Sequence, residues 1–198
     1  MMLYQLRYFI LLLSSLLLHS CLGKQSSEDS AEMFSFDKTL IGVDVSDEIL
    51  GIKFNPPIDW ELMPSSLSKK MELRINPSDD FTYQPVYVFF NKLNGSLLSS
   101  GIVSSNDTSA SDNSIINFYK VLLTSKYKNS NLVVDTFIHS RITFNLIKFD
   151  IENLTAHRLF FLNSSGQIVQ LEYSFRKDSL DSVLPAIKAS IGSIRLVN

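Results

Sequence analysis

The region between Leu132 and Phe175 constrains the fold most, because it contains successive strand patterns with no helical pattern between them. The strands are predicted at 132–138, 141–151, 157–162 and 167–175. In the last of them, apolar residues alternate strictly with Gln170, Glu172 and Ser174, as in a strand with one buried face. Strands joined by short turns, such as the turn at 163–166, pair antiparallel. The chain is therefore expected to build an antiparallel sheet, with the polar face of the last strand in solvent.

The second of these strand patterns changes phase along its length. Ile142, Phe144 and Leu146 share one face, whereas Ile147, Phe149 and Ile151 fall on the other. A strand that packs against a single layer cannot bury both sets unless an extra residue is inserted. A bulge or bend is therefore predicted near Leu146 and Ile147.

Helices and further strands are predicted on both sides of this region. Helical spacing of apolar residues predicts helices at 65–74, from Asp112 onward and at 180–191. Strand patterns predict a hairpin of 49–54 with 60–62, a second hairpin of 86–90 with 97–103, and a closing segment at 193–197. Trp60, the single tryptophan, is expected to fill the core between sheet and helix. The predicted fold class is α+β, a central antiparallel sheet of about seven or eight strands in hairpins, flanked by helices.

Residues 1–20 have the layout of a secretory signal peptide. Arg7 is the one charged side chain of this segment, the run Tyr8–Leu18 is uncharged, and the small residue Ser20 stands at its end. A membrane-spanning helix needs roughly 20 apolar residues, so the run is marginal for a span. Residues 1–20 are therefore expected to be a signal peptide that is cleaved from the mature protein.

Leu18, His19, Ser20 and Cys21 resemble the bacterial lipobox, which has Leu three residues before the cysteine and a small residue just before it. His19 departs from the pattern, because small or aliphatic residues are usual there. The resemblance implies that the Cys21 thiol receives a diacylglyceryl group, that cleavage precedes Cys21, and that the new amino terminus is acylated, for instance with palmitate. A plain secretory signal that ends at a cysteine, or an uncleaved anchor, would explain the same residues.

The cysteine content agrees with lipidation. Cys21 is the only cysteine of the chain, so no intramolecular disulfide can form. A lone thiol outside the cytoplasm invites intermolecular pairing unless the thiol has a use, and lipidation is such a use. Several acyl chains would hold the protein at a membrane far more firmly than one. Cys21 is therefore the predicted lipidation site.

The mature chain is expected to consist of the lipidated cysteine with a flexible tether, 21–48, and a single domain, 49–198. Leu22–Ala31 is polar and Ser-rich, with too little apolar surface to offset the entropy of ordering. Residues 32–48 are ambiguous, because several apolar side chains there could pack on the domain.

The same ambiguous segment carries an acidic patch, formed by Asp44, Asp47 and Glu48. The patch is either a cation site or part of a solvated loop that precedes a helix. The segment lacks the pattern of a calcium-binding loop, which has oxygen ligands at alternating positions and a glycine at its turn. This favours the solvated loop.

Gly51 to Trp60 (GIKFNPPIDW), followed by a helix, further hairpins and the ending Ile187 to Ile194 (IKASIGSI), resemble the PsbP-like group. This group is named after an extrinsic subunit of photosystem II, and its bacterial members include lipoproteins. The resemblance covers residues 49–197 and implies a central antiparallel sheet with helices on its faces. The group shares no catalytic residues, and its members mostly act as assembly or binding accessories, so the functional implication is by analogy only.

Charge and motifs exclude several classes of function. The formal net charge is −2 at pH 7, so neither nucleic acid nor an anionic membrane surface is an expected partner. His19, His139 and His157 lack neighbouring Cys or His at the spacing of metal ligands. No nucleophile elbow or phosphate-cradling glycine loop is present. The sequence therefore predicts no catalytic residue, no metal site and no cofactor.

Two functions remain. The favoured one is a non-enzymatic lipoprotein of the bacterial cell envelope, anchored through lipid on Cys21, facing the periplasm or the exterior, that binds a protein partner or a small ligand on its open sheet face. Leu22 is not an acidic retention signal, which favours an outer membrane where there is one. The alternative is an envelope enzyme, for example a hydrolase, with a site assembled from distant strands by Asp135, His139 and His157.

These two functions predict different surfaces. An enzyme needs a base or nucleophile that is oriented by a second group, and no local spacing in this sequence supplies such a pair. Convergent polar side chains in a concave pocket would favour the enzyme, whereas a shallow patch with an aromatic rim would favour the binding protein.

Overall fold

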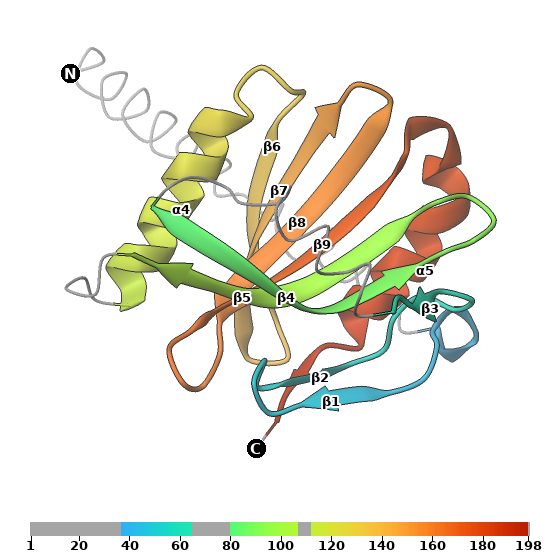
Figure 1. The fold of residues 1–198 in the computed structure, drawn as a ribbon, viewed down its shortest axis with the longest axis horizontal. Helices are drawn as coiled ribbons and strands as arrows, with labels where there is room; N and C mark the ends of the chain where they lie inside the picture. The colour runs from blue at the N-terminus through green and yellow to red at the C-terminus, as the bar shows by residue number, and fades with distance from the viewer. Residues whose placement is uncertain (1–36, 65–79, 107–111, 198) are drawn as a thin grey trace, which may run out of the picture. The chain divides into compact units, whose positions relative to one another are not determined.

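The computed structural model describes residues 37–64, 80–106 and 112–197. Residues 1–36, with the predicted signal peptide and Cys21, and the helix predicted at 65–74 lie outside the described residues. The larger sheet has seven strands in the order β3-β4-β5-β9-β8-β7-β6, and every neighbouring pair is antiparallel (Figure 1).

Two α-helices flank this sheet among the described residues, so the predicted α+β class is confirmed. The helices are α4 (Asp112–Lys126) and α5 (Leu180–Gly192). The strands are β3 (Glu61–Leu62), β4 (Phe81–Phe90), β5 (Leu97–Ser105), β6 (Val133–His139), β7 (Ile142–Ile151), β8 (Leu154–Leu162) and β9 (Ile168–Arg176).

The strands predicted between residues 132 and 175 are β6 to β9, and each pairs with its neighbour in the sequence. The predicted hairpin of 86–90 with 97–103 is also confirmed, as β4 and β5. The turn between these strands is stabilised by a hydrogen bond of 2.8 Å from the Leu93 amide to Asn91 Oδ1. Gly95 follows with φ +72°, a left-handed conformation that glycine adopts without steric cost.

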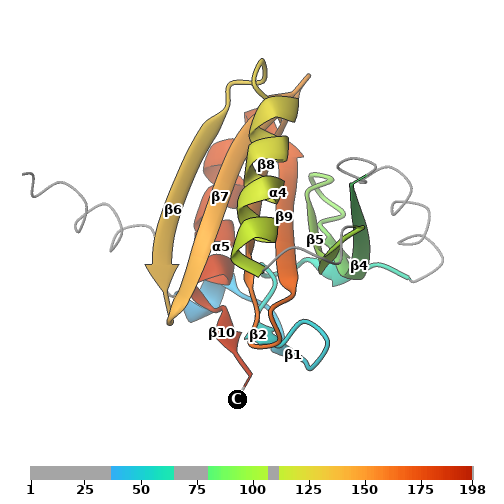
Figure 2. The ribbon, with the colours of Figure 1, turned by 90° about the vertical axis from the view of Figure 1, so that its left-hand side faces the viewer.

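The two helices cover opposite faces of the sheet (Figure 2). Tyr119 of α4 donates a hydrogen bond to Gln170 of β9, whereas Tyr173 of β9 bonds Ser190 of α5. Side chains an odd number of residues apart on a strand point to opposite faces, so Gln170 and Tyr173 mark the two faces. We call these the α4 face and the α5 face.

A stripe of buried residues holds α4 against the sheet. Its members recur at helical spacing and are Ile116, Tyr119, Leu123 and Tyr127, the last just beyond the helix. Val183, Ile187 and Ile191 form the corresponding buried stripe of α5. Each helix therefore adds an apolar layer to one face of the sheet.

The bulge predicted near Leu146 and Ile147 is wrong. The register of β7 runs without a shift against both β6 and β8. Phe144 and Leu146 point to the α5 face, Ile147 and Phe149 to the α4 face, and none of the four is more than 3% exposed. Ile151, at the end of β7, is exposed, but the other residues of both sets are buried because a helix covers each face. No inserted residue is therefore needed.

The solvent exposure predicted for the polar face of β9 is also wrong. Gln170 is 1% exposed, and the side chain of Glu172 is 15% exposed. Both lie on the α4 face, where the helix packs over them. The alternating pattern of β9 correctly predicts a strand, but the polar side chains on it are buried rather than solvated.

A second, three-stranded sheet joins the two ends of the domain. It has the order β1-β2-β10, formed by β1 (Val45–Asp47), β2 (Ile52–Phe54) and β10 (Arg195–Leu196). The 3-10 turn η1 (Lys38–Leu40) precedes it, and a second one, η2 (Lys177–Ser179), precedes α5. Part of the segment 32–48, which the sequence left ambiguous between tether and domain, thus forms η1 and β1, and β1 pairs with β2.

The predicted hairpin of 49–54 with 60–62 is wrong. The two edges of β2 are occupied by β1 and β10, and β3 instead pairs with β4 of the larger sheet. Trp60, which is 7% exposed, packs edge-on against Tyr173 with ring centroids 6.4 Å apart. Its predicted position in the core is confirmed, and this contact fixes the end of the segment onto the α5 face.

Candidate functional site

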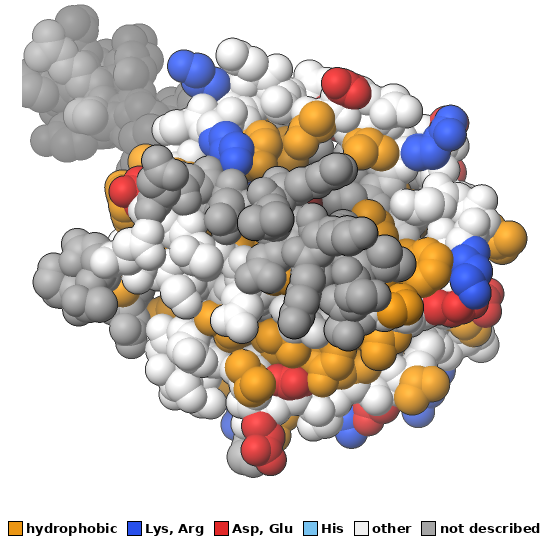
Figure 3. Space-filling view, in the orientation of Figure 1, with side chains coloured by type: hydrophobic (Ala, Val, Ile, Leu, Met, Phe, Trp, Pro, Cys, Tyr) orange, Lys and Arg blue, Asp and Glu red, His pale blue; other side chains and the backbone are white. Residues whose placement is uncertain are grey.

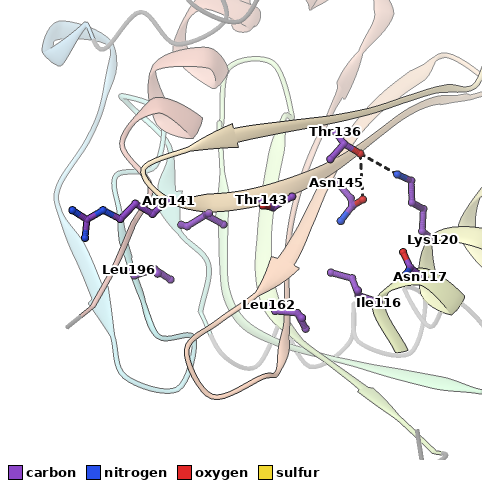
Figure 4. A pocket seen from close by; sticks show the side chains of 10 residues that line it. Ile116, Asn117, Lys120, Thr136, Arg141, Thr143, Asn145, Leu162 and Leu196 are labelled. Carbon is purple, nitrogen blue, oxygen red and sulfur yellow. Dashed lines mark hydrogen bonds between the residues drawn. The ribbon is translucent and has the colours of Figure 1, made fainter. Parts of the chain in front are cut away.

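A cleft of about 570 Å³ lies on the α4 face, between α4 and strands β6 and β7 (Figure 4). Strands β8 and β10 each contribute one leucine to its lining. The lining residues are Ile116, Asn117, Lys120, Thr136, Arg141, Ile142, Thr143, Asn145, Leu162 and Leu196. A volume of this size is in the range of small-molecule sites.

Local structure explains why these side chains meet. Ile116 and Lys120 are four residues apart on α4 and therefore lie on one side of the helix. Thr143 and Asn145 are two residues apart on β7 and share the α4 face. Thr136 of β6 is the register partner of Asn145, so it extends the same face to the edge of the sheet.

One end of the cleft is polar and hydrogen-bonded. Lys120 Nζ donates to Thr136 Oγ1 at 3.0 Å, and Thr136 Oγ1 donates to Asn145 Oδ1 at 3.4 Å (Figure 4). An ammonium group has three N–H donors. Within the described part of the chain, Lys120 uses one of them, so it can donate further bonds to a ligand.

The charged side chains that line the cleft, among the described residues, are both positive. Lys120 and Arg141 lie at opposite ends of the group drawn in Figure 4, and neither forms an ion pair with a described residue. None of the ten lining residues is Asp, Glu, His or Cys. The described lining can therefore hold an anion, but it offers no carboxylate, imidazole or thiol for proton transfer or nucleophilic attack.

A buried ion pair lies on the same face beneath α4. Arg158 of β8 and Glu172 of β9 are register partners. Arg158 donates from Nε and Nη2 to Glu172 Oε2, each at 2.5 Å, and the two side chains are 4% and 15% exposed. Such a pair contributes little net stability, because removing both charges from water offsets their attraction.

Aromatic rings enclose the guanidinium group. Tyr127 and Phe149 stack with ring centroids 3.7 Å apart, and the Arg158 guanidinium carbon lies 5.5 Å and 5.3 Å from these two rings. Burial raises the pKa of Tyr119, so its hydroxyl stays protonated and donates to Gln170 Oε1 at 2.5 Å. Among the described residues, Arg158 Nη1 and Gln170 Nε2 have no hydrogen-bond partner. The cluster is thus partly satisfied, which costs stability.

The residues of the predicted enzyme site do not converge. Asp135 is register-paired with Leu146, whereas His157 is paired with Lys148 on the far side of β7. Asp135 and His139 are four residues apart on β6, which separates them by about 13 Å. His139 Nε2 lies 3.0 Å from the Gly192 carbonyl oxygen, at the end of α5.

His157 is a buried core residue. It is 7% exposed and packs edge-on against Phe175, with ring centroids 5.2 Å apart. Burial, and to a lesser extent the charge of Lys148, lowers the pKa of His157 to about 4. The imidazole is therefore neutral at physiological pH and lies on the α5 face, opposite the cleft.

Asp44 and Asp47 of the acidic patch predicted at 44–48 form contacts with other residues of the domain. Asp44 forms an ion pair of 2.6 Å with Lys53, and Asp47 accepts hydrogen bonds from the Tyr87 hydroxyl at 2.8 Å and the Leu50 amide at 2.7 Å. In the described ranges, no group of three or more His, Cys, Asp or Glu residues could hold a metal ion. On the face in Figure 3, basic and acidic side chains are interspersed around the rim.

No helix in the described ranges has both the length and the apolar character needed to span a membrane. Cys21, the predicted lipidation site, lies outside these ranges.

The sequence analysis missed the cleft. Lys120, Thr136 and Asn145 come from three different elements, and none of them belongs to a recognisable motif. The one available signal was the position of Lys120 on the polar side of the predicted helix. That signal predicts a solvated lysine as readily as a ligand-binding one.

Comparison with protein-family models and with curated proteins gives no match. Among solved structures, cyanobacterial PsbP (CyanoP) from Synechocystis sp. PCC 6803 is 12% identical with a TM-score of 0.48, over 80% of this chain and 94% of that one. LpqN, described as involved in cell envelope biogenesis of Mycobacterium tuberculosis, is 12% identical with a TM-score of 0.49, over 79% and 90% of the two chains.

A structure from Bacteroides thetaiotaomicron VPI-5482 is 11% identical with a TM-score of 0.38, over 75% of this chain and 46% of that one. Cyanobacterial PsbP is thus among the similar structures, as the PsbP-like resemblance led us to expect. With TM-scores below 0.5, these similarities carry no argument about function.

Proposed function

We propose that this protein is a lipid-anchored accessory of the bacterial cell envelope that binds a small ligand or a protein partner and has no catalytic activity of its own. The observation that carries the proposal is the cleft on the α4 face, with a volume of about 570 Å³ and a lining of cationic, amide, hydroxyl and apolar side chains. Such a lining provides recognition without the acid–base pair that catalysis requires.

The anchor in this proposal is Cys21. The lipobox-like residues Leu18 to Cys21 end the uncharged run of the signal peptide, and the polar residues Leu22–Ala31 would separate the bilayer from the domain. A lipid-anchored domain on such a spacer can meet partners at or near the membrane surface.

Intact-mass analysis tests the anchor. The full chain, expressed in a bacterium and extracted from membranes, is expected to begin at Cys21 and to carry the additional mass of a diacylglyceryl group and an acyl chain. The Cys21→Ser variant is expected to lack the lipid mass. Ser20→Ala is the matched control, because it keeps a small residue before the cysteine and should still be processed. An unmodified wild-type chain with a free thiol would contradict the anchor.

The absence of catalysis is tested on the residues of the alternative function. The cleft is concave and polar, which was the expected mark of an enzyme, but Asp135, His139 and His157 all lie outside its lining. A triple variant, Asp135→Asn with His139→Gln and His157→Gln, is expected to keep the biological phenotype of the wild type. Its circular dichroism and melting temperature serve as the folding control. A variant that folds normally but behaves as a deletion would overturn the proposal in favour of an enzyme.

A further inference from the structure

We infer that the cleft on the α4 face binds a small amphipathic anion, a carboxylate or phosphate carried on a short apolar body. The inference rests on the proposed function and names the class of ligand that the binding protein takes. The anion would lie at Lys120, and the apolar body would lie along the leucine and isoleucine side chains of the lining.

The polar end of the cleft is built to receive an acceptor. Lys120 Nζ is held 3.0 Å from Thr136 Oγ1, which orders the lysine side chain across the gap between α4 and β6. Hydrogen bonds from an ammonium group to a carboxylate or phosphate are charge-assisted and stronger than neutral ones. Asn117 lies three residues before Lys120 on α4. Its exposed side-chain amide can also donate a hydrogen bond to the ligand.

The charge of the cleft selects against cations and favours anions. Lys120 and Arg141 are the charged members of the lining, and both are positive in a chain whose net charge is −2. These positive charges attract an anionic ligand and repel a cationic one. Arg141, at the other end, strengthens the positive potential along the cleft.

The apolar side chains of the lining would contact the apolar body of the ligand. Ile116 is 9% exposed, and Leu162 and Leu196 are half-buried, so all three present partly accessible apolar surface. In Figure 4, Leu162 and Leu196 lie apart from the Lys120–Thr136–Asn145 group, and Ile116 lies beside it. Covering this surface removes apolar area from water and favours a ligand with an aliphatic or aromatic body.

The experiment titrates the full chain, extracted in a nonionic detergent, with octanoate, octyl phosphate, 1-octanol and inorganic phosphate. Backbone amide NMR shifts of Lys120, Thr136 and Asn145 report binding at the cleft and not in the micelle. Octanoate or octyl phosphate is expected to shift these amides in a saturable manner, and the tighter of the two identifies the headgroup. 1-Octanol and inorganic phosphate are each expected to bind at least about tenfold more weakly, because each lacks half of the interaction.

Variants of one lysine separate charge from structure. Lys120→Gln is expected to weaken octanoate binding by about tenfold or more, and Lys120→Arg to retain most of it. Lys128→Gln is the matched control, because it removes the same charge from an exposed lysine that does not line the cleft.

Two outcomes would overturn the inference: equal binding of 1-octanol and octanoate, or undiminished affinity in Lys120→Gln. Absence of any shift with octanoate and octyl phosphate would do the same. In each of these cases, recovery of a specific partner by crosslinking the full chain in cells would still support the proposed binding function. The ligand class and the function therefore fail separately.

Discussion

On the α5 face of the large sheet, the core is built mainly from aromatic and aliphatic side chains, among them Phe144, Phe161 and Leu171, all fully buried. The α4 face contains a similar apolar cluster but also buries Arg158, the one charged residue in the described buried set. The open cleft lies on the α4 face as well. The comparison indicates that both faces bury apolar side chains, and that the α4 face also accepts a buried charge and retains a space for recognition.

Polar groups on the α4 face restrict how its parts can pack. Arg158 can satisfy its charge only when β8, β9 and the rings of Tyr127 and Phe149 are in place. Apolar side chains tolerate several arrangements, whereas a buried ion pair requires one geometry. We therefore expect substitutions on the α5 face to change mainly stability, and substitutions of the ion pair to change the arrangement around α4 as well.

Trp60→Ala should give the largest effect, because it opens a cavity in the core on the α5 face. Trp60 is 7% exposed and packs against Tyr173. The free energy of unfolding is expected to fall by about 3–5 kcal/mol, measured by urea denaturation. A change below about 0.5 kcal/mol would mark an exposed tryptophan and contradict its role in the core.

Glu172→Ala should be the most damaging change to the polar cluster. It leaves the Arg158 guanidinium buried without its carboxylate, which is expected to cost about 3 kcal/mol of unfolding free energy. The double variant Arg158→Met with Glu172→Leu should recover most of this loss. Asp178→Ala, which breaks the exposed ion pair with Arg176, is the matched control and should leave the melting temperature unchanged. If Glu172→Ala is as stable as the wild type, the difference that we infer between the two faces is contradicted.

Acid should destabilise the domain through His157. Its pKa is about 4 in the fold and 6.5 in an unfolded chain, so between these values the unfolded state binds more protons. The stabilisation is fully present above about pH 6.5 and is lost as the pH falls toward 4, by roughly 2–3 kcal/mol. Unfolding free energies measured between pH 4 and 7 should show this slope in the wild type. His157→Leu should flatten it, and an unchanged slope would contradict a buried neutral imidazole.

Removing single hydroxyl groups compares the two faces at the finest scale. Tyr119→Phe leaves Gln170 with a further unpaired atom and should cost about 1–3 kcal/mol. Tyr173→Phe should cost about 1 kcal/mol or less, because Ser190 Oγ keeps its 2.6 Å hydrogen bond to the Asn55 carbonyl. Thermal or urea unfolding of both variants provides the measurement. The reverse order of costs would mean that the α5 face carries the more demanding polar contacts.

Strand existence was predictable from the sequence, but what covers each strand was not. The alternation around Gln170 and Glu172 correctly located β9, and the same alternation wrongly indicated solvent on its polar side. The reason is that α4 comes from a distant part of the chain, and a local pattern contains no information on what packs over it. The bulge predicted in β7 failed for the same reason, since two helices bury the two sets of apolar residues.

The cleft lay beyond sequence reasoning because it depends on register. Thr136 and Asn145 meet across β6 and β7, and Lys120 reaches them only because α4 packs over β7 and β8, next to that edge of the sheet. Each residue alone is ordinary for a surface strand or helix. The fold class, by contrast, rests on many separate strand and helix patterns, so errors at single positions did not alter it.

The pairing of β2 with β10 places a constraint on the order in which the domain folds. Neighbouring strands such as β6 to β9 can close as hairpins within microseconds, whereas Lys53 must find Arg195 from the opposite end of the domain. Contacts between distant residues form slowly, although the entropy of closing a loop rises only gradually with its length. An isolated pair of β1 and β2 is marginal in water. We therefore expect the first strand of the domain to become ordered late in folding, when the last residues of the chain reach β2.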